Sequence, residues 1–153
     1  VRLPDDGVVR IYNHVGSVQV IVDVVGYYDD VELFEQGRYI SFEPFRAIDT
    51  RIDSPFPTPG ALGHGDILYW GAADDALAAY LLNVTVTDVI GPGFVTAYPY
   101  SDELSVPPLA STLNYVGGST VPNHAIVRTG PYLGFFNFGG RVQLVVDVFG
   151  AFI

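Results

Sequence analysis

Asp49, Thr50 and Arg51 stand side by side in this chain of 153 residues, and together they offer a carboxylate, a hydroxyl and a guanidinium. Such groups can transfer protons or bind a charged ligand. Successive side chains of a strand point to opposite faces, so Asp49 and Arg51 share one face and Thr50 lies on the other. We favour a structural ion pair, because the planar guanidinium binds carboxylates and carbonyls well. Arg51 is then expected to be buried, and ligand binding is the alternative.

Asp23 and Asp147 lie within apolar runs, VQVIVDVV and VQLVVDVF. A carboxylate buried in such a strand needs a partner. Arg46 and Arg51 are the best candidates, and with Asp49 these residues form the predicted structural network. Metal ligation is the alternative, with Ca²⁺ as the ion, but EF-hand spacing is absent. We therefore expect no resident metal or cofactor.

Other constellations that carry out chemistry are missing from the sequence. There is no cysteine, which excludes thiolate nucleophiles and thiolate metal sites. The histidines, His14, His64 and His124, do not have the spacing of zinc ligands. No serine lies in a GxSxG elbow, and no glycine-rich phosphate motif occurs. The sequence predicts no catalytic residues and a protein that is not an enzyme.

Aromatic residues are abundant, with ten tyrosines and ten phenylalanines. Tyr98, Tyr100 and Tyr115 flank polar loops, where their rings could stack on sugars. The alternative is that these rings fill cores and subunit interfaces, where tyrosine is favoured.

Composition narrows the partners and the compartment. Seven arginines, with no lysine, oppose 17 acidic residues, and this net charge of −10 argues against nucleic acid. The apolar runs are too short to insert in a membrane as helices. A chain that is 49% hydrophobic and only 16% charged is expected to bury apolar surface against a neighbour. The absence of cysteine, methionine and lysine fits an extracellular or cell-surface location.

The end of the chain repeats its beginning. Ile11–Tyr28 reads IYNHVGSVQVIVDVVGYY, and Phe135–Phe152 reads FFNFGGRVQLVVDVFGAF. The identical pairs are Asn13/Asn137, Gly16/Gly140, Val18/Val142, Gln19/Gln143, Val22/Val146, Asp23/Asp147, Val24/Val148 and Gly26/Gly150. Self-similarity at a fixed offset indicates a tandem repeat. We expect residues 1–28 to be a hairpin equivalent to the tail of a preceding repeat, 29–36 a linker and 37–153 a full repeat unit.

Short β-branched and aromatic runs between glycines and prolines predict an all-β protein. We expect a hairpin of Val8–Asn13 with Ser17–Val25, and its copy of Tyr132–Asn137 with Arg141–Phe149. Other predicted strands are Tyr39–Phe42, Phe45–Thr50, Ile67–Trp70, Tyr80–Thr87, Phe94–Tyr98, Thr112–Tyr115 and Ala125–Thr129. Turns are expected at Gly139–Gly140, at Gly91–Gly93 and at Gly117–Gly118, because glycine supplies the positive φ of tight turns.

Five blocks in one order carry a resemblance to a known family. They are AIDTR at residues 47–51, LNVTVT at 82–87, GFVTAYP at 93–99, TLNY at 112–115 and VVDVFG at 145–150. This order resembles the tandem LDTR…LNVTVT…LNY…VVDVVGYF repeats of secreted and cell-wall-associated proteins of actinobacteria and related bacteria. The resemblance implies a secreted, β-rich surface module, and it transfers no catalytic residues.

We therefore expect an all-β fold, a β-sandwich of mainly antiparallel sheets with a duplicated terminal β-hairpin. The expected function is that of an extracellular structural module that associates head to tail with copies of itself in a surface filament or repeat array. The predicted assembly interface comprises Val18, Val20, Val22, Val24, Tyr27 and Tyr28. The alternative is an accessory module that binds cell-wall or other polysaccharide.

Overall fold

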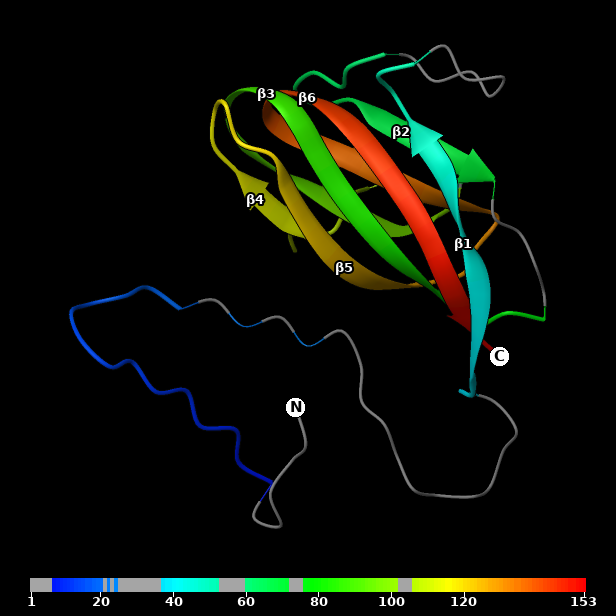
Figure 1. Ribbon diagram of the computed structural model, residues 1–153, viewed down its shortest axis with the longest axis horizontal. Coiled ribbons are helices and arrows are strands. Elements are labelled where there is room, and N and C mark those ends of the chain that lie inside the picture. Colours follow the sequence, from blue (N-terminus) through cyan, green and yellow to red (C-terminus); the bar gives the residue numbers. More distant parts are fainter. Residues whose placement is uncertain are drawn as a thin grey trace.

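The computed structural model describes residues 7–20, 22, 24, 37–52, 60–71, 76–101 and 106–153. This part of the chain is all-β, and none of it forms a helix that could span a membrane. The six strands are β1 (Tyr39–Asp49), β2 (Ile67–Gly71), β3 (Ala79–Tyr100), β4 (Leu113–Tyr115), β5 (Val121–Arg128) and β6 (Tyr132–Phe152). All pairings between these strands are antiparallel, as expected (Figure 1).

β3 and β6 are the centre of the fold. They pair with each other along their whole length, from Ala79 opposite Phe152 to Tyr100 opposite Tyr132. β1 and β2 pair with β6 on its other side, while β4 and β5 pair with β3. Each of the two long strands therefore pairs with two shorter strands, one in each of its halves.

The turns expected at Gly91–Gly93 and Gly139–Gly140 are wrong. At both places one long strand continues, so the predicted hairpin of Tyr132–Asn137 with Arg141–Phe149 does not form. The glycines instead mark two successive bulges, which we call the double bulge: β3 has one residue more than β6 between Thr87 and Ile90, and again between Ile90 and Gly93, which lie opposite Gln143, Arg141 and Gly139. A bulge bends the strand that carries it, so two in succession bend β3, and β6 bends with it where the two strands remain paired.

Steric crowding explains why glycine occupies the double bulge. A Cβ on Gly140 would overlap the carbonyl oxygen of Ile90, and a Cβ on Gly93 would overlap that of Phe138. Gly139 has φ of 109°, a left-handed conformation that residues with a side chain rarely adopt. The backbones of β3 and β6 thus approach too closely for any side chain between them.

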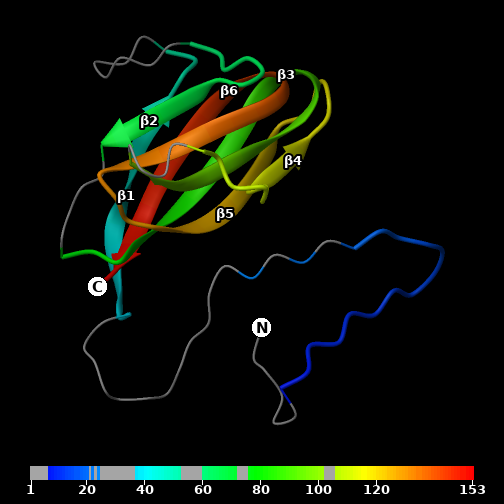
Figure 2. The same cartoon turned by 180° about the vertical axis from the view of Figure 1, so that it is seen from behind.

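Because β3 and β6 bend, the apolar sides of both ends contribute to one core (Figures 1 and 2). Alternate residues along β3 and β6 point inward, as the period of a strand requires. The fully buried aliphatic side chains of the two strands are Leu82, Val84, Val86, Val95, Leu133, Val142, Leu144, Val146 and Val148. Phe135 is the largest fully buried side chain of the described residues.

β1 is one strand, although Pro44 suggested two short ones. Its pairing with β6 shifts register between Ser41 and Phe45, which places Pro44 within an irregular stretch. Proline has no N–H to donate to the ladder, and it is tolerated there because an irregular stretch does not require that hydrogen bond. The strand predicted at Ile67–Trp70 is confirmed as β2, and β4 and β5 fall at the two strands expected around Gly117–Gly118.

The predicted N-terminal hairpin of Val8–Asn13 with Ser17–Val25 is not found among the described residues 7–20, 22 and 24, which contain no strand. We call these residues the N-terminal segment. Its large hydrophobic side chains are all exposed, whereas their sequence counterparts in β6 are largely buried. The two copies of the repeat therefore occupy different environments within one chain.

Candidate functional site

The ion-pair network predicted from the sequence lies where β1 ends against β6. Asp49 is the last residue of β1, and its carboxylate is only 5% exposed. Arg51 donates to it through Nε, 2.8 Å from Oδ1, and through Nη2, 2.7 Å from Oδ2. The backbone N–H of Arg51 donates to the same Oδ1 at 3.1 Å. This bidentate geometry is the strong form of an arginine–carboxylate interaction.

Arg46 links this pair to the neighbouring strand. Its Nε donates to Oδ1 of Asp147 at 2.8 Å and its Nη2 to Oδ2 at 3.2 Å, while Nη1 reaches Oδ2 of Asp49 at 3.2 Å. The two arginines that the sequence suggested as partners are thus those that contact these carboxylates. Asp23, the counterpart of Asp147 in the repeat, lies outside the described residues.

The network lowers the pKa of Asp49 to about 2, chiefly because the Arg51 side chain donates hydrogen bonds to the carboxylate. Burial opposes this effect, and the Arg51 backbone N–H and the charge of Arg46 add to it. The same hydrogen bonds raise the pKa of Arg51 and, through Asp147, that of Arg46. Asp49, Arg46 and Arg51 are therefore held in their charged forms.

Arg51 itself is not buried, which corrects the expectation from the sequence. Its side chain is 42% exposed, and the buried member of the pair is Asp49. The long side chain of arginine reaches back from solvent to a carboxylate at the edge of the core, so only one of the two charges is desolvated. The geometry is that of a structural clamp.

Thr50 completes the attachment of β1 to β6. Its hydroxyl donates to Oε1 of Gln143 at 2.6 Å and accepts from the backbone N–H of Leu144 at 2.8 Å. Its own N–H donates to the carbonyl of Leu144 at 2.9 Å. The triplet Asp49-Thr50-Arg51 thus has a structural function at each position. Among the residues that the structure describes, no three acidic or histidine side chains gather as a metal site would require.

Asn137 is a buried polar residue that we did not single out as a site. Its Oδ1 accepts from the Tyr115 hydroxyl at 2.5 Å, and its Nδ2 lies within hydrogen-bonding distance of the carbonyls of Gly63 (2.9 Å) and Gly140 (2.7 Å). It therefore connects β4, the loop before β2 and the double bulge. The identity of Asn13 with Asn137 was the available signal.

Two of the three tyrosines predicted to stack on sugars are buried. Tyr115 is engaged with Asn137, and the Tyr98 ring packs over Gly134, where its hydroxyl has no partner. Tyr100 is half-buried and forms an aromatic cluster with Tyr69 and Tyr132, at ring-centroid distances of 4.3 and 6.4 Å. A hydrogen bond with Tyr100 raises the pKa of Tyr69 to about 12.

This tyrosine cluster (Tyr69, Tyr100 and Tyr132) brings together residues from β2, β3 and β6. Tyr69 and Tyr132 are each about half exposed. Exposed tyrosine rings offer flat apolar surfaces with a polar tip, a chemistry that suits sugar rings or a protein interface. Sequence reasoning missed Tyr69 and Tyr132, because the pairing of β6 with β3 brings Tyr132 beside Tyr100 and the pairing of β2 with β6 adds Tyr69.

The apolar residues predicted as an assembly interface are exposed in the N-terminal segment. Val18, Val20 and Val22 are each more than half exposed, and Val24 is 85% exposed. Tyr27 and Tyr28 lie outside the described residues. Asn13 and Gly16 form a local turn in which Nδ2 of Asn13 donates to the Gly16 carbonyl at 2.8 Å.

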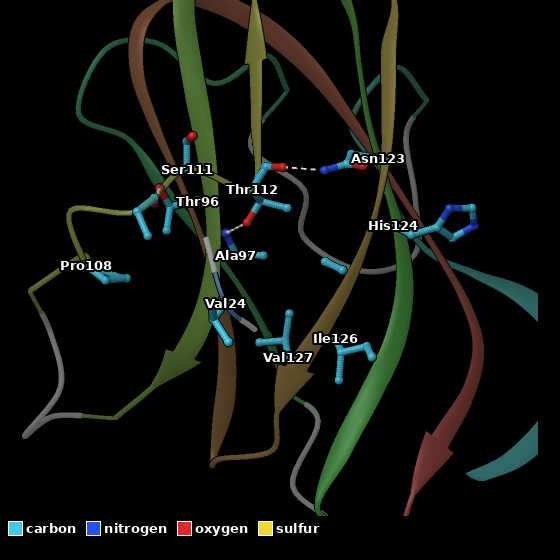
Figure 3. Close-up of a pocket in the computed structure, with 12 residues that line it drawn as sticks. Val24, Thr96, Ala97, Pro108, Ser111, Thr112, Asn123, His124, Ile126 and Val127 are labelled. Atoms are coloured by element: carbon cyan, nitrogen blue, oxygen red, sulfur yellow. Dashed lines mark hydrogen bonds between the residues drawn. The ribbon is translucent and has the colours of Figure 1, made fainter. Parts of the chain in front are cut away.

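Val24 lies at a cavity of about 420 Å³ beside β5 and the second half of β3 (Figure 3). Thr112 and Asn123 meet at this cavity, where Nδ2 of Asn123 donates to the Thr112 carbonyl at 2.6 Å and the Thr112 hydroxyl accepts from the N–H of Ala97 at 2.8 Å. The walls are a mixture of polar and apolar side chains, and they include His124, Ser111 and Thr96.

No protein-family model matches the chain, and no match is found among the curated proteins or among the solved structures.

Proposed function

We propose that this chain is a non-enzymatic, extracellular structural module that associates head to tail with modules of its own kind, in a surface filament or repeat array. The observation that carries the proposal is the N-terminal segment, a valine-rich sequence of strand type whose apolar side chains are exposed. A segment of this composition that forms no strand and exposes its apolar side chains invites pairing with the sheet of another chain.

The arrangement of the remaining chain supports a mechanical function. The bent sheet places apolar residues of both halves in one core, and we interpret this as a β-sandwich. The charged groups of the ion-pair network are engaged with one another at the edge of that core. Side chains that elsewhere form active sites here tie β1 to β6.

The extracellular part of the proposal rests on composition and on the resemblance to secreted bacterial repeats. The chain has no cysteine, no methionine and no lysine, so it offers little to oxidants and few sites to trypsin-like proteases. Its net charge of −10 keeps such a module soluble and away from nucleic acid.

Sedimentation velocity over a range of concentrations, with negative-stain electron microscopy, tests the proposal. We expect the intact chain to form assemblies whose mass rises with concentration. A chain carrying Val18→Asp, Val20→Asp and Val22→Asp should remain monomeric, because charges on this face oppose its burial. The control is Ser17→Asp, which adds charge on the opposite side of the same segment. A monomeric intact chain at high concentration, or equal assembly of all three chains, would contradict the proposal.

The alternative is a module that binds cell-wall or other polysaccharide, and the tyrosine cluster favours it. Two half-exposed rings on either side of Tyr100 resemble a platform for sugars. Co-sedimentation with purified cell walls separates the two proposals. A binding module remains monomeric and loses its affinity in a Tyr69→Ala, Tyr132→Ala variant, whereas a structural module assembles without any wall material.

A further inference from the structure

We propose that the N-terminal segment is a second β6-type strand, and that its binding partner is the β6 slot in another copy of this module. The β6 slot is the position in the sheet between β3 on one side and β1 and β2 on the other. This inference rests on the proposed self-association and specifies its contact. The slot is central in the sheet, so the proposed contact differs from the addition of a strand at a free edge.

The sequence identities fall at positions that the slot buries. Val142, Val146 and Val148 of β6 are fully buried, and Val18, Val22 and Val24 are their counterparts. Val20 corresponds to Leu144, which is also fully buried. The N-terminal segment therefore has an aliphatic residue at each of these four buried positions.

The polar and glycine identities also coincide with requirements of the slot. Gly140 faces the backbone of Ile90 so closely that a Cβ would overlap it, and Gly16 stands at the matching position. Gln143 accepts a hydrogen bond from the Thr50 hydroxyl, and the counterpart of Gln143 is Gln19. Gly16 also has φ of 76° in the segment, a conformation that itself favours glycine, so the match at Gln19 carries more weight. The identities at both positions indicate a strand that is suited to the slot.

A side-chain hydrogen bond is also shared. In β6, Nδ2 of Asn137 donates to the carbonyl of Gly140 at 2.7 Å, within the double bulge. In the N-terminal segment, Nδ2 of Asn13 donates to the carbonyl of Gly16 at 2.8 Å. The backbones differ, because the positive φ is at Gly16 in the segment and at Gly139 in β6. The segment thus makes the bulge's own hydrogen bond, and its backbone must rearrange at this turn on entering a slot.

Two mismatches explain why β6, and not the N-terminal segment, holds the slot in this structure. Val15 corresponds to Gly139, where φ is 109° and a Cβ would crowd the Pro92 carbonyl. Arg10 corresponds to Gly134, where a Cβ would meet the Tyr98 ring at 2.9 Å. The intact β6 is the better fit within its own chain, so the segment is expected to enter the slot of another copy only when the β6 of that copy leaves it.

A vacant slot can be made in the full-length chain by matched changes in both strands. The acceptor chain carries Gly140→Val and Val146→Asp, which disable β6, together with Gly16→Val and Val22→Asp, which disable its own N-terminal segment. Labelled with ¹⁵N, this acceptor is refolded with an excess of unlabelled intact chain as the donor. The matched control donor carries only Gly16→Val and Val22→Asp.

We expect the acceptor alone to give the collapsed amide spectrum of an unfolded chain, and the intact donor to restore dispersed signals in a 1:1 complex. The control donor should restore none. No restoration by either donor, or equal restoration by both, would overturn the inference. Adding Val15→Gly to the intact donor should tighten the complex at least several-fold, because it removes the worst mismatch.

A second full-length chain keeps the test decisive if refolding in mixtures is inefficient. This chain carries only Gly140→Val and Val146→Asp, and its N-terminal segment is intact. We expect it to retain a cooperative thermal transition that the four-substitution acceptor lacks. Identical melting of the two chains would overturn the inference. Assembly of the intact chain, measured separately by sedimentation, would then leave the proposed function standing.

Discussion

At the scale of single residues, the charges of this chain are arranged to hold two strands together. Asp49 has one buried carboxylate and two arginine partners, Arg46 and Arg51, whose side chains remain in contact with solvent. Exposed ion pairs contribute little to stability, because water screens them. Here the carboxylate is desolvated, so its removal leaves the arginines without their partner and its protonation breaks the network.

Stability should therefore depend on pH in the acid range. The pKa of Asp49 is about 2 in the folded chain, against an ordinary value of 3.8. Its contribution is present above pH 4 and is lost as the pH falls from about 4 to 2, since the unfolded chain takes up the proton first. The shift corresponds to about 2 kcal/mol at neutral pH. Asp49→Asn should lower the free energy of unfolding at neutral pH by this amount. The stability of the variant should then fall less steeply between pH 4 and pH 2.

Urea unfolding at pH 7 and at pH 2.5, followed by the fluorescence of Trp70, measures this effect. Glu43→Gln is the matched control, because it removes an exposed carboxylate from the same strand. If Asp49→Asn and Glu43→Gln shift the midpoint equally at both pH values, the network does not have the proposed energetic role.

At the scale of elements, the double bulge determines the shape of the sheet. It allows each of β3 and β6 to pair with two shorter strands while remaining one continuous strand. The close approach at Gly140 and Gly93 means that the bend depends on the absence of side chains at these positions rather than on any attractive contact.

We expect Gly140→Ala to destabilise the fold by about 3 kcal/mol or more, since the new methyl group must displace the backbone of Ile90. Gly71→Ala is the matched control. It lies at the end of β2 with an ordinary φ, and the nearest atom to a new Cβ is a ring carbon of Tyr132 at 4.0 Å. Thermal melting of both variants gives the comparison. Equal stability of the two would show that the bend tolerates side chains.

The strands were predictable from the sequence, but their continuity was not. The inward face of β6 follows from the alternation of its residues, because the period of two depends only on local backbone geometry. The glycines of the double bulge also satisfy the local signature of a tight turn. What distinguishes the two is the partner strand, where Gly93 faces Gly139 from far along the chain. Pairing between distant segments is not encoded in either segment alone.

The site shows the same division between local and distant information. The charge pattern suggested Arg46 and Arg51 as partners of the carboxylates, since few cations are available. The exposure of Arg51 could not be predicted, because it depends on β1 being at the edge of the sheet. The tyrosine cluster likewise exists only after β2 has paired with β6.

At the scale of the whole molecule, the continuity of β3 and β6 should make folding a single event. Each strand contributes to the core near both of its ends, so neither half of the sheet can separate without breaking both strands. We expect one calorimetric transition whose van't Hoff and calorimetric enthalpies agree.

Trp70 packs against Tyr80 and Phe45, and it reports on β2 and its surroundings. Val146→Ala removes buried methyl groups next to β1. It should lower the midpoint of unfolding by the same amount in Trp70 fluorescence as in far-UV circular dichroism. We expect the free energy of unfolding to fall by about 1–3 kcal/mol. Two separate transitions, or a fluorescence midpoint that does not move, would show that the halves unfold independently.

The start of β1 lies beside the end of β6, where Tyr39 pairs with Phe152 and the N–H of Gly37 donates to the carbonyl of Ile153 (Figure 1). A tension applied through residues 37 and 153 therefore acts on the first rung of an antiparallel ladder. The hydrogen bonds between β1 and β6 would then be loaded one after another, as in a zipper, and not all together in shear. A low force would separate β1 from β6, starting at Tyr39. The separation would proceed as far as Arg46 and Asp49, whose ion pairs are the first strong interactions that resist it. In an array under load, each module would yield a short, reversible length of chain before its core was disturbed.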